Sequence, residues 1–355
     1  MNVAIIGAGL AGLSCAHELE KHGISPIIYE RNSYIGEQYP HVGAILNVLA
    51  RPIGEPMKYF NNKLGIDLTP LNTVNRIVHY SPRKTTVIKG NLGYFFKRSK
   101  EPDDIKNQIF SKLKNTKIVF NTASDYEPLS KQYEHLVIAN GNINFTNELG
   151  CWMEWVNTHV RGAVVLGDFD PNTLLVWLNK NYSKNGYAYL SPFDSKKASL
   201  ILVVTDVNEK EIDYFWELFL HTENIKYTIV EEFKLSHKSG NAYPHKVDNI
   251  FLTGNAAGTI DPFLGFGVLS SVVTGVMAAR AIAENRDYEK LINPIVKDNL
   301  QLYEFRKAFN TLNNSSYNAL ISSIGIPGLK HLVYFTPINF VKIGAAFLKL
   351  KSKMK

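Results

Sequence analysis

Hydrophobic positions at the start of the chain follow the order strand, turn, helix and strand. Residues 3–6 are a short, β-branched apolar run, which is typical of a buried parallel strand and too brief for a helix. A helical pattern then extends to about residue 22, and residues 26–29 predict a second strand. The opening segment therefore predicts a β-α-β unit of a parallel sheet.

The next part of the chain alternates between loops and short strands. Residues 33–47 are punctuated by Gly and Pro, so we expect a long loop without regular structure over much of its length. Residues 75–78 and 85–88 flank a Ser-Pro turn and predict a hairpin. Further strands are expected at 117–120 and 135–139. Loops at the carboxyl ends of such parallel strands are common binding sites.

From about residue 142 to 235 the pattern changes. Strands are expected at 163–166, 187–190 and 200–204, with one helix near 209–220. This pattern indicates an inserted antiparallel sheet with a helix on one face. After it, a strand at 249–253 and a second glycine-rich turn return to the opening pattern, and the remainder from about residue 287 reads as helical.

The turn after the first strand carries the spacing G-x-G-x-x-G. Gly7 permits a tight turn, Gly9 lets a pyrophosphate approach the backbone, and Gly12 lets the helix pack on the strand. Glu30 ends the second strand 18 residues after Gly12, near the spacing expected for the acid that binds a ribose 2′-hydroxyl. We predict a dinucleotide site here that favours a free ribose over a 2′-phosphate, with Arg31 beside Glu30.

A second glycine cluster follows the strand at 249–253 and leads into a nearly uncharged segment. The predicted cofactor residues of this cluster are Gly254, Asn255, Gly258, Pro262, Gly265 and Gly267. A second helix N-terminus here would face the far end of one extended cofactor, where negative charge develops when a flavin is reduced. The pair of motifs therefore favours FAD over NAD. We interpret the segment after Pro262 as a buried helix rather than a membrane span.

The motifs together resemble those of a known superfamily. GAGLAG with YER, a strand ending in IANG, and IFLTGNAAGTIDPFLGFGV occur in the order seen in flavoproteins of the p-hydroxybenzoate hydroxylase and geranylgeranyl reductase superfamily, over residues 1 to about 285. That superfamily usually has Gly-Asp at the start of the second motif, with the carboxylate on the ribityl chain. Asn255 stands in that place, and its carbonyl oxygen can accept the same hydrogen bond.

Two other comparisons with that superfamily concern the substrate side. GYAYLSP is similar to the Tyr-x-Trp-x-Phe-Pro element of geranylgeranyl reductases, which lines the isoprenoid cavity, although Tyr189 replaces Trp. An ordinary aromatic strand facing its own core explains Tyr187 and Tyr189 equally well. The loop that carries a Cys-Gly pair in those reductases has His41 and no cysteine, so the family's proton donor does not transfer. Arg98 stands where relatives often have an Arg near the flavin, or is a solvated basic residue.

The fold class expected is α/β (α+β). It combines a Rossmann-like FAD-binding domain with a parallel sheet, an inserted antiparallel-sheet substrate domain and a helical C-terminus. The expected divisions are 1–142 with 241–286 for FAD, 143–240 for substrate, and 287–355 for the helical region.

Composition narrows the possibilities further. The chain is 45% hydrophobic and 20% charged, as in ordinary globular proteins. A net charge of +7 raises the question of nucleic acid, but the basic residues are scattered and no nucleic-acid-binding motif is present. The two cysteines exclude a disulfide framework, the ten histidines show no metal spacing, and no signal peptide is evident. We expect a cytoplasmic protein without a metal.

The C-terminal residues 338–353 place lysines on one helical stripe and apolar residues toward the other side. Such a helix can lie on an anionic membrane surface, or it can dock on its own protein with the lysines in water.

The leading hypothesis is an FAD-dependent oxidoreductase that reduces a double bond of an apolar, isoprenoid or lipid substrate. No second G-x-G-x-x-G occurs, so electrons would come from a transiently bound NAD(P)H or from an electron-donor protein. The alternatives are an FAD-dependent monooxygenase, a non-catalytic lipid escort protein resembling Rab GDP-dissociation inhibitors, and an NAD-dependent dehydrogenase. The last leaves the second glycine cluster without a role.

Overall fold

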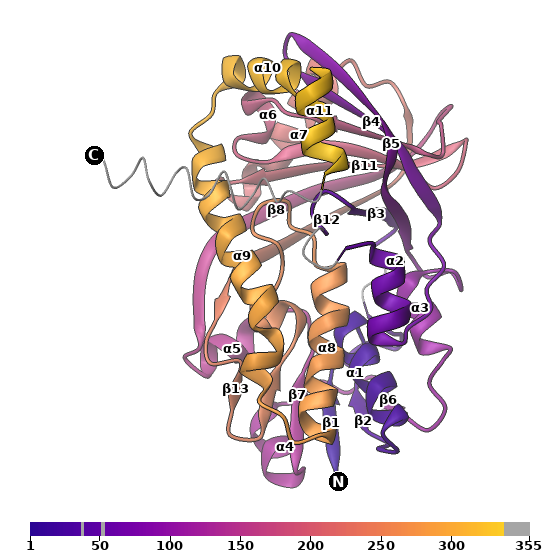
Figure 1. Ribbon diagram of the computed structural model, residues 1–355, viewed down its shortest axis with the longest axis vertical. Helices are drawn as coiled ribbons and strands as arrows, with labels where there is room; N and C mark the ends of the chain where they lie inside the picture. The colour runs from indigo at the N-terminus through magenta and orange to yellow at the C-terminus, as the bar shows by residue number, and fades with distance from the viewer. Residues whose placement is uncertain (37–38, 51–53, 337–355) are drawn as a thin grey trace.

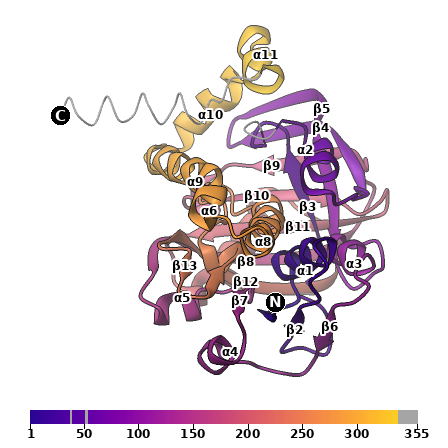
Figure 2. The same ribbon diagram turned by 60° about the horizontal axis from the view of Figure 1, so that its bottom comes forward.

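Two sheets occupy opposite ends of the molecule, with helices between and around them (Figures 1 and 2). The computed structural model describes residues 1–36, 39–50 and 54–336. The six-stranded sheet has the order β13 (Lys246–Val247), β14 (Ile250–Leu252), β7 (His135–Ile138), β1 (Val3–Ile6), β2 (Ile27–Tyr29) and β6 (Lys117–Val119). All neighbouring pairs are parallel except β13 with β14.

The eight-stranded sheet is antiparallel apart from one pair. Its order is β12 (Thr228–Ala242), β8 (Trp152–Leu166), β11 (Lys197–Thr205), β10 (Tyr187–Pro192), β9 (Thr173–Trp177), β4 (Asn72–Ser81), β5 (Lys84–Arg98) and β3 (His41–Leu46). Only β4 and β9 run parallel. The expected fold class is therefore confirmed.

The helices cover these sheets and connect them. They are α1 (Leu10–Lys21), α2 (Pro56–Tyr59) with a π-helical turn (Phe60–Leu64), α3 (Ile105–Phe110), α4 (Tyr126–Gln132), α5 (Asn144–Glu148), α6 (Lys180–Ser183), α7 (Ile212–Thr222), α8 (Val268–Ala283), α9 (Tyr288–Asn310), α10 (Asn314–Ser323) and α11 (Pro327–Phe335). Two short 3-10 helices span Glu209–Glu211 and Gly254–Ala257.

The helices α1 and α8 pack side by side at the centre of the molecule (Figures 1 and 2). Gly275 makes this approach possible, because a Cβ atom there would lie 2.2 Å from the carbonyl oxygen of Ala11. Apolar residues of both helices join strand β1 in one buried core. Both glycine loops precede these two helices, so their packing brings the loops together.

The eight-stranded sheet takes strands from both sides of residue 142. The predicted hairpin is confirmed, since β4 and β5 pair in antiparallel register with Ile77 opposite Ile88. It extends the sheet expected from 143–240, so that sheet also contains strands that precede residue 143. The division into domains stays a prediction.

One sequence expectation is wrong in part. Within the segment expected to be irregular, residues 41–46 form strand β3, which pairs with the end of β5. The run Val42 to Leu46 is apolar and three of its side chains, Val42, Ala44 and Leu46, pack into the core of the eight-stranded sheet. Burial against a neighbouring strand outweighs the Gly and Pro residues that indicated a loop.

None of the helices in the described ranges is both long and apolar enough to cross a membrane. The nearly uncharged segment after Pro262 forms α8, which is buried along most of its length, as expected. The basic stretch 338–353 lies outside the described residues.

Candidate functional site

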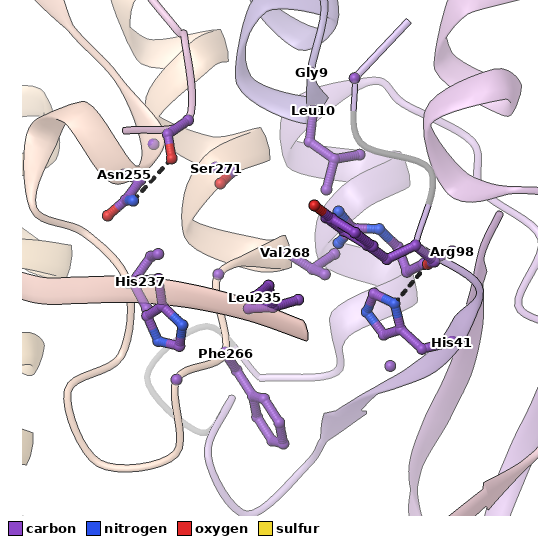
Figure 3. A pocket seen from close by; sticks show the side chains of 18 of the residues that line it. Gly9, Leu10, His41, Arg98, Leu235, His237, Asn255, Phe266, Val268 and Ser271 are labelled. Carbon is purple, nitrogen blue, oxygen red and sulfur yellow. Dashed lines mark hydrogen bonds between the residues drawn. The ribbon is translucent and has the colours of Figure 1, made fainter. Parts of the chain in front are cut away.

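One cavity of about 490 Å³ lies between the two glycine loops and one face of the eight-stranded sheet (Figure 3). The predicted site residues that line it are Gly7, Gly9, Glu30, Arg31, His41, Arg98, Tyr187, Tyr189, Gly254, Asn255, Gly265 and Gly267. Those that do not line it are Gly12, Gly258 and Pro262. The fold thus brings together residues more than 200 positions apart, and their roles toward a ligand stay predictions.

The first glycine loop is shaped by close backbone contacts. Gly7 has φ +103°, and a Cβ atom there would lie 2.5 Å from the carbonyl oxygen of Ala139. At Gly12 a Cβ atom would lie 2.0 Å from the carbonyl oxygen of Gly7, so Gly12 serves packing. Gly9 is the N-cap of α1 and has open space where a Cβ atom would stand. Of these three glycines, only Gly9 has open space beside it that a ligand could occupy.

Glu30 is buried, and both of its carboxylate oxygens receive backbone hydrogen bonds. The N–H of Ala8 donates to one oxygen at 2.8 Å, and the N–H of Asn32 donates to the other at 2.9 Å. Each carboxylate oxygen has a further lone pair for a hydroxyl donor. A second cavity of about 210 Å³ begins beside Glu30 and Arg31 and extends along Thr122 and Asn142. These features fit the adenosine end of a dinucleotide.

The second glycine loop also has a buried polar group. The Asn255 side-chain N–H donates to the carbonyl oxygen of Gly141 at 2.9 Å, which fixes the orientation of the amide (Figure 3). Its Oδ1 is buried and has no partner among the described residues. An acceptor in this state fits the predicted hydrogen bond from a ribityl hydroxyl. A carboxylate in the same orientation would face the Gly141 carbonyl, so an amide suits this position better than a carboxylate.

The other residues of the second loop differ in role. Gly258 has φ +67°, and a Cβ atom there would lie 2.7 Å from the backbone nitrogen of Ala242, so it serves packing against β12. Gly267 is the N-cap of α8 and has no side-chain cap, as is also true of Gly9 on α1. Two uncapped helix N-termini therefore meet one cavity, and both favour negative charge. The residues present fit FAD.

The opposite wall of the cavity is an apolar face of the eight-stranded sheet. Its side chains are Val160 from β8, Tyr187 and Tyr189 from β10, Ile201 and Val203 from β11, and Phe233 and Leu235 from β12. The two tyrosine rings stack with centroids 5.8 Å apart, and burial raises the pKa of both phenols. The Tyr187 hydroxyl donates to the carbonyl oxygen of Leu264 at 2.5 Å. Both tyrosines thus line the site as well as the core.

His41 and Arg98 are opposite each other where β3 pairs with β5. The His41 Nδ1 lies 2.8 Å from the carbonyl oxygen of Tyr39, so this nitrogen carries the hydrogen (Figure 3). The His41 ring also lies 6.0 Å from Phe233. The strand β3, which sequence analysis missed, is what places His41 in the cavity.

Sequence reasoning overlooked several cavity residues. Phe233, Leu235 and His237 follow one another along β12 at a spacing of two residues. Side chains at this spacing lie on one face of a strand, so the sequence could have placed all three together. Lys106 is buried in the cavity wall, with its Nζ 2.9 Å from Asp104 and 2.6 Å from the carbonyl oxygen of Ser99. No sequence signal identifies Lys106, because its burial depends on how α3 packs.

Comparisons with known proteins agree with this geometry. Residues 5–43 match the family described as "NAD(P)-binding Rossmann-like domain". A curated relative, digeranylgeranylglycerophospholipid reductase 3 from Methanosphaera stadtmanae, is 21% identical over 82% of this chain and 80% of its own length. Other curated relatives match much less of their length, such as a possible lysine-specific histone demethylase 1 from Drosophila melanogaster, of which 14% is covered.

Solved structures share the fold over nearly the whole chain. A geranylgeranyl bacteriochlorophyll reductase-like protein from Thermoplasma acidophilum has a TM-score of 0.76 at 16% identity and covers 97% of this chain and 95% of its own. A flavin-dependent halogenase has a TM-score of 0.65 at 16% identity, covering 99% and 77%. The chain has the fold of the FAD-dependent p-hydroxybenzoate hydroxylase and geranylgeranyl reductase superfamily. A p-nitrophenol 4-monooxygenase from Pseudomonas putida shares this flavoprotein fold with a TM-score of 0.59 at 13% identity over 99% of this chain and 95% of its own.

The resemblance stated from the sequence is thereby confirmed. This is the fold of FAD-dependent oxidoreductases. The fold, the dinucleotide motif and the buried Asn255 oxygen, which has no partner in the part of the chain that the structure describes, agree on FAD as the cofactor.

Proposed function

We propose that this chain is an FAD-dependent reductase of a carbon–carbon double bond in an apolar, isoprenoid-like lipid. The observation that carries the proposal is the cavity of about 490 Å³ that runs from Glu30, past both glycine loops, to the apolar face of the eight-stranded sheet. The name of the Methanosphaera stadtmanae relative, a digeranylgeranylglycerophospholipid reductase, supports a substrate of this class.

The chain's own residues bind and orient the two ligands. Bound FAD, once reduced, supplies a hydride. The apolar side chains of β10, β11 and β12 exclude water and hold an apolar substrate against the glycine loops. Transfer of a hydride to one carbon requires a proton for the other carbon. We assign proton delivery to His237, which lines the cavity. Its Nε2 lies beside Gly265 of the second glycine loop, 3.2 Å from where a Cβ atom of that glycine would stand.

The first test is spectroscopic and chemical. The purified protein should be yellow with bound FAD, and after reduction by dithionite without air it should add two hydrogens to a geranylgeranyl lipid, detected by mass spectrometry. His237→Asn should slow this step at least about tenfold, while His221→Asn, on the exposed end of α7, should not. A colourless protein that never binds FAD would contradict the proposal and favour the lipid escort alternative.

The alternative function is an oxygen-using flavoenzyme, which the fold shared with p-nitrophenol 4-monooxygenase favours. Reduced protein would then insert an oxygen atom from labelled O₂ into its substrate. If it instead saturates the lipid without air, the monooxygenase alternative fails.

We propose that the electron donor is either a transiently bound NAD(P)H or a donor protein. Reduction of the bound FAD by NADH or NADPH alone would identify the nicotinamide as the donor, and no reduction would favour a donor protein.

We further propose that residues 338–353 contact an anionic membrane surface, which would bring the protein to a lipid substrate. Co-sedimentation with anionic but not neutral vesicles is expected for the whole chain. A chain ending at residue 336 should lose this binding, and equal binding by both forms would contradict the proposal.

A further inference from the structure

The second glycine loop is held in place by helix α9, which lies beside α8 (Figure 1). Arg306 of α9 is 5% exposed, and its Nη1 donates to the carbonyl oxygens of Pro262 and Phe263 at 3.1 and 2.9 Å. Its Nη2 donates to the Thr205 hydroxyl at 2.9 Å and to the carbonyl oxygen of Asn185 at 3.3 Å. One guanidinium thus joins the loop to the end of the eight-stranded sheet.

Other groups of α9 act on the same loop. The Asn299 side-chain N–H approaches the carbonyl oxygens of Gly258 and Ile260 at 3.4 and 3.3 Å. The Phe263 ring packs edge-on against Phe305 and Phe309, with centroids 5.0 and 5.1 Å apart. Helix α9, which belongs to the region 287–355 that was expected to be separate, therefore contacts the second glycine loop at several points.

These bonds fix the peptide planes just before α8. The carbonyls of Pro262 and Phe263 are bound by Arg306, and the carbonyl of Leu264 is bound by Tyr187. The N–H of Phe263 donates to the Asp261 carboxylate at 2.7 Å, and the N–H of Gly265 donates to the Asp261 carbonyl at 2.9 Å.

The next peptide groups are arranged differently. Within the described ranges, no hydrogen-bond partner is found for the backbone N–H groups of Phe266, Gly267 and Val268, and all three residues line the cavity. Immobilised donors of this kind stabilise negative charge without reorganisation. The buried Arg306 guanidinium adds a positive charge to the loop, because guanidinium groups stay protonated in proteins, and the Asp261 carboxylate near it offsets part of that charge.

We propose that Arg306 is a positioning residue that holds the loop 262–265, orients the N–H groups at the start of α8, and raises the reduction potential of the bound flavin. This inference rests on the proposed FAD-dependent function. The guanidinium is the only part of α9 that binds two successive loop carbonyls and carries charge. Its loss would free the loop and remove the charge together.

The test compares Arg306→Met and Arg306→Lys with Arg280→Met. Arg280 also joins distant elements, through Glu18 and the Lys63 carbonyl, but at the far end of α8. In Arg306→Met, FAD should bind about tenfold more weakly, the flavin potential should become more negative, and the flavin absorption bands should shift. Arg306→Lys keeps the charge but not the paired bonds, so it should restore most of the potential and less of the affinity.

Arg280→Met should lose stability while its flavin potential and spectrum stay those of the natural chain. If Arg306→Met only lowers stability and leaves potential and spectrum unchanged, the inference is wrong. If Arg306→Met does not fold, Arg306→Lys decides by the same readouts. A natural chain that binds no FAD would overturn the proposed function itself, a result separate from these.

Discussion

The two glycine loops line one cavity but are built differently. The first takes its hydrogen bonds from residues within about thirty positions, because the Gly7 N–H donates to the Tyr29 carbonyl at 2.8 Å and Glu30 accepts from Ala8, although Gly7 also packs closely on the distant Ala139. The second depends on distant groups, since Asn255 binds Gly141 and Arg306 binds Pro262 and Phe263.

The first loop thus depends mainly on residues near it in the sequence, and the second depends on contacts that form only in the tertiary structure. The first loop should respond mainly to changes in its own backbone contacts and at Ala139, and changes in α9 should leave it intact. The second loop should respond to changes in α9, which carries no motif, and in β10, which is distant from the loop in the sequence. Four substitutions, two of them with matched controls, test this difference between the loops.

The largest effect is expected from Gly12→Ala. Its Cβ atom would lie 2.0 Å from the Gly7 carbonyl oxygen, inside van der Waals contact with rigid backbone. The free energy of unfolding should fall by at least about 3 kcal/mol, measured by chemical denaturation. The matched variant Gly9→Ala meets no atom within 4 Å. It should lose no more than about 1 kcal/mol, the cost of a poorer N-cap, and it should lose FAD binding; equal destabilisation of both would contradict this distinction.

Glu30→Gln should have the next largest effect. A Gln offers one acceptor where the carboxylate offers two, so the N–H of Ala8 or of Asn32 would face an amide donor. We expect a loss of about 1–3 kcal/mol in stability and at least tenfold weaker FAD binding, measured by denaturation and by titration of the FAD-free protein. Unchanged FAD affinity would rule out the ribose role of Glu30.

Asn255→Asp examines the second loop. At neutral pH the new carboxylate would face the Gly141 carbonyl in place of a 2.9 Å hydrogen bond. Stability should fall by about 1–2 kcal/mol and recover on acidification, because a protonated Asp can donate again. Asn249→Asp is the control, since Asn249 donates to the Ser130 and Tyr133 carbonyls away from the cavity. Only Asn255→Asp should also alter FAD affinity, and parallel behaviour of both would argue against a cofactor role.

Asp261→Asn should give the smallest effect. Burial raises the pKa of Asp261 from 3.8 to about 6, so the folded state binds this proton more tightly than the unfolded state does. Its contribution to stability is complete below about pH 4 and is lost as pH rises through about 6. Asn keeps an acceptor for the Phe263 N–H and removes the charge, so stability at pH 7.5 should rise by on the order of 1 kcal/mol. Thermal melting between pH 4 and 8 checks this, and an unchanged pH profile would contradict it.

The parts predicted correctly from the sequence are those whose cause is local. The strand, turn and helix around Gly7 and Gly9, the hairpin of β4 and β5, and the buried helix α8 follow from periodicity and turn residues. Strand β3 was missed because its apolar residues are buried by β5, a partner about fifty residues away. His237 was overlooked although its two-residue spacing from Leu235 was visible.

By itself, the sequence determined that a parallel β-α-β unit with a dinucleotide loop begins this chain, and that a second glycine loop returns near its end. Neighbouring residues suffice for these features, because backbone geometry and hydrophobic period act over a few positions. Only the tertiary structure decided that the loops share a cavity, that an apolar sheet face closes it, and that Arg306 holds the second loop. Those contacts join residues far apart along the chain, and their energies exist only once the helices and sheets have packed.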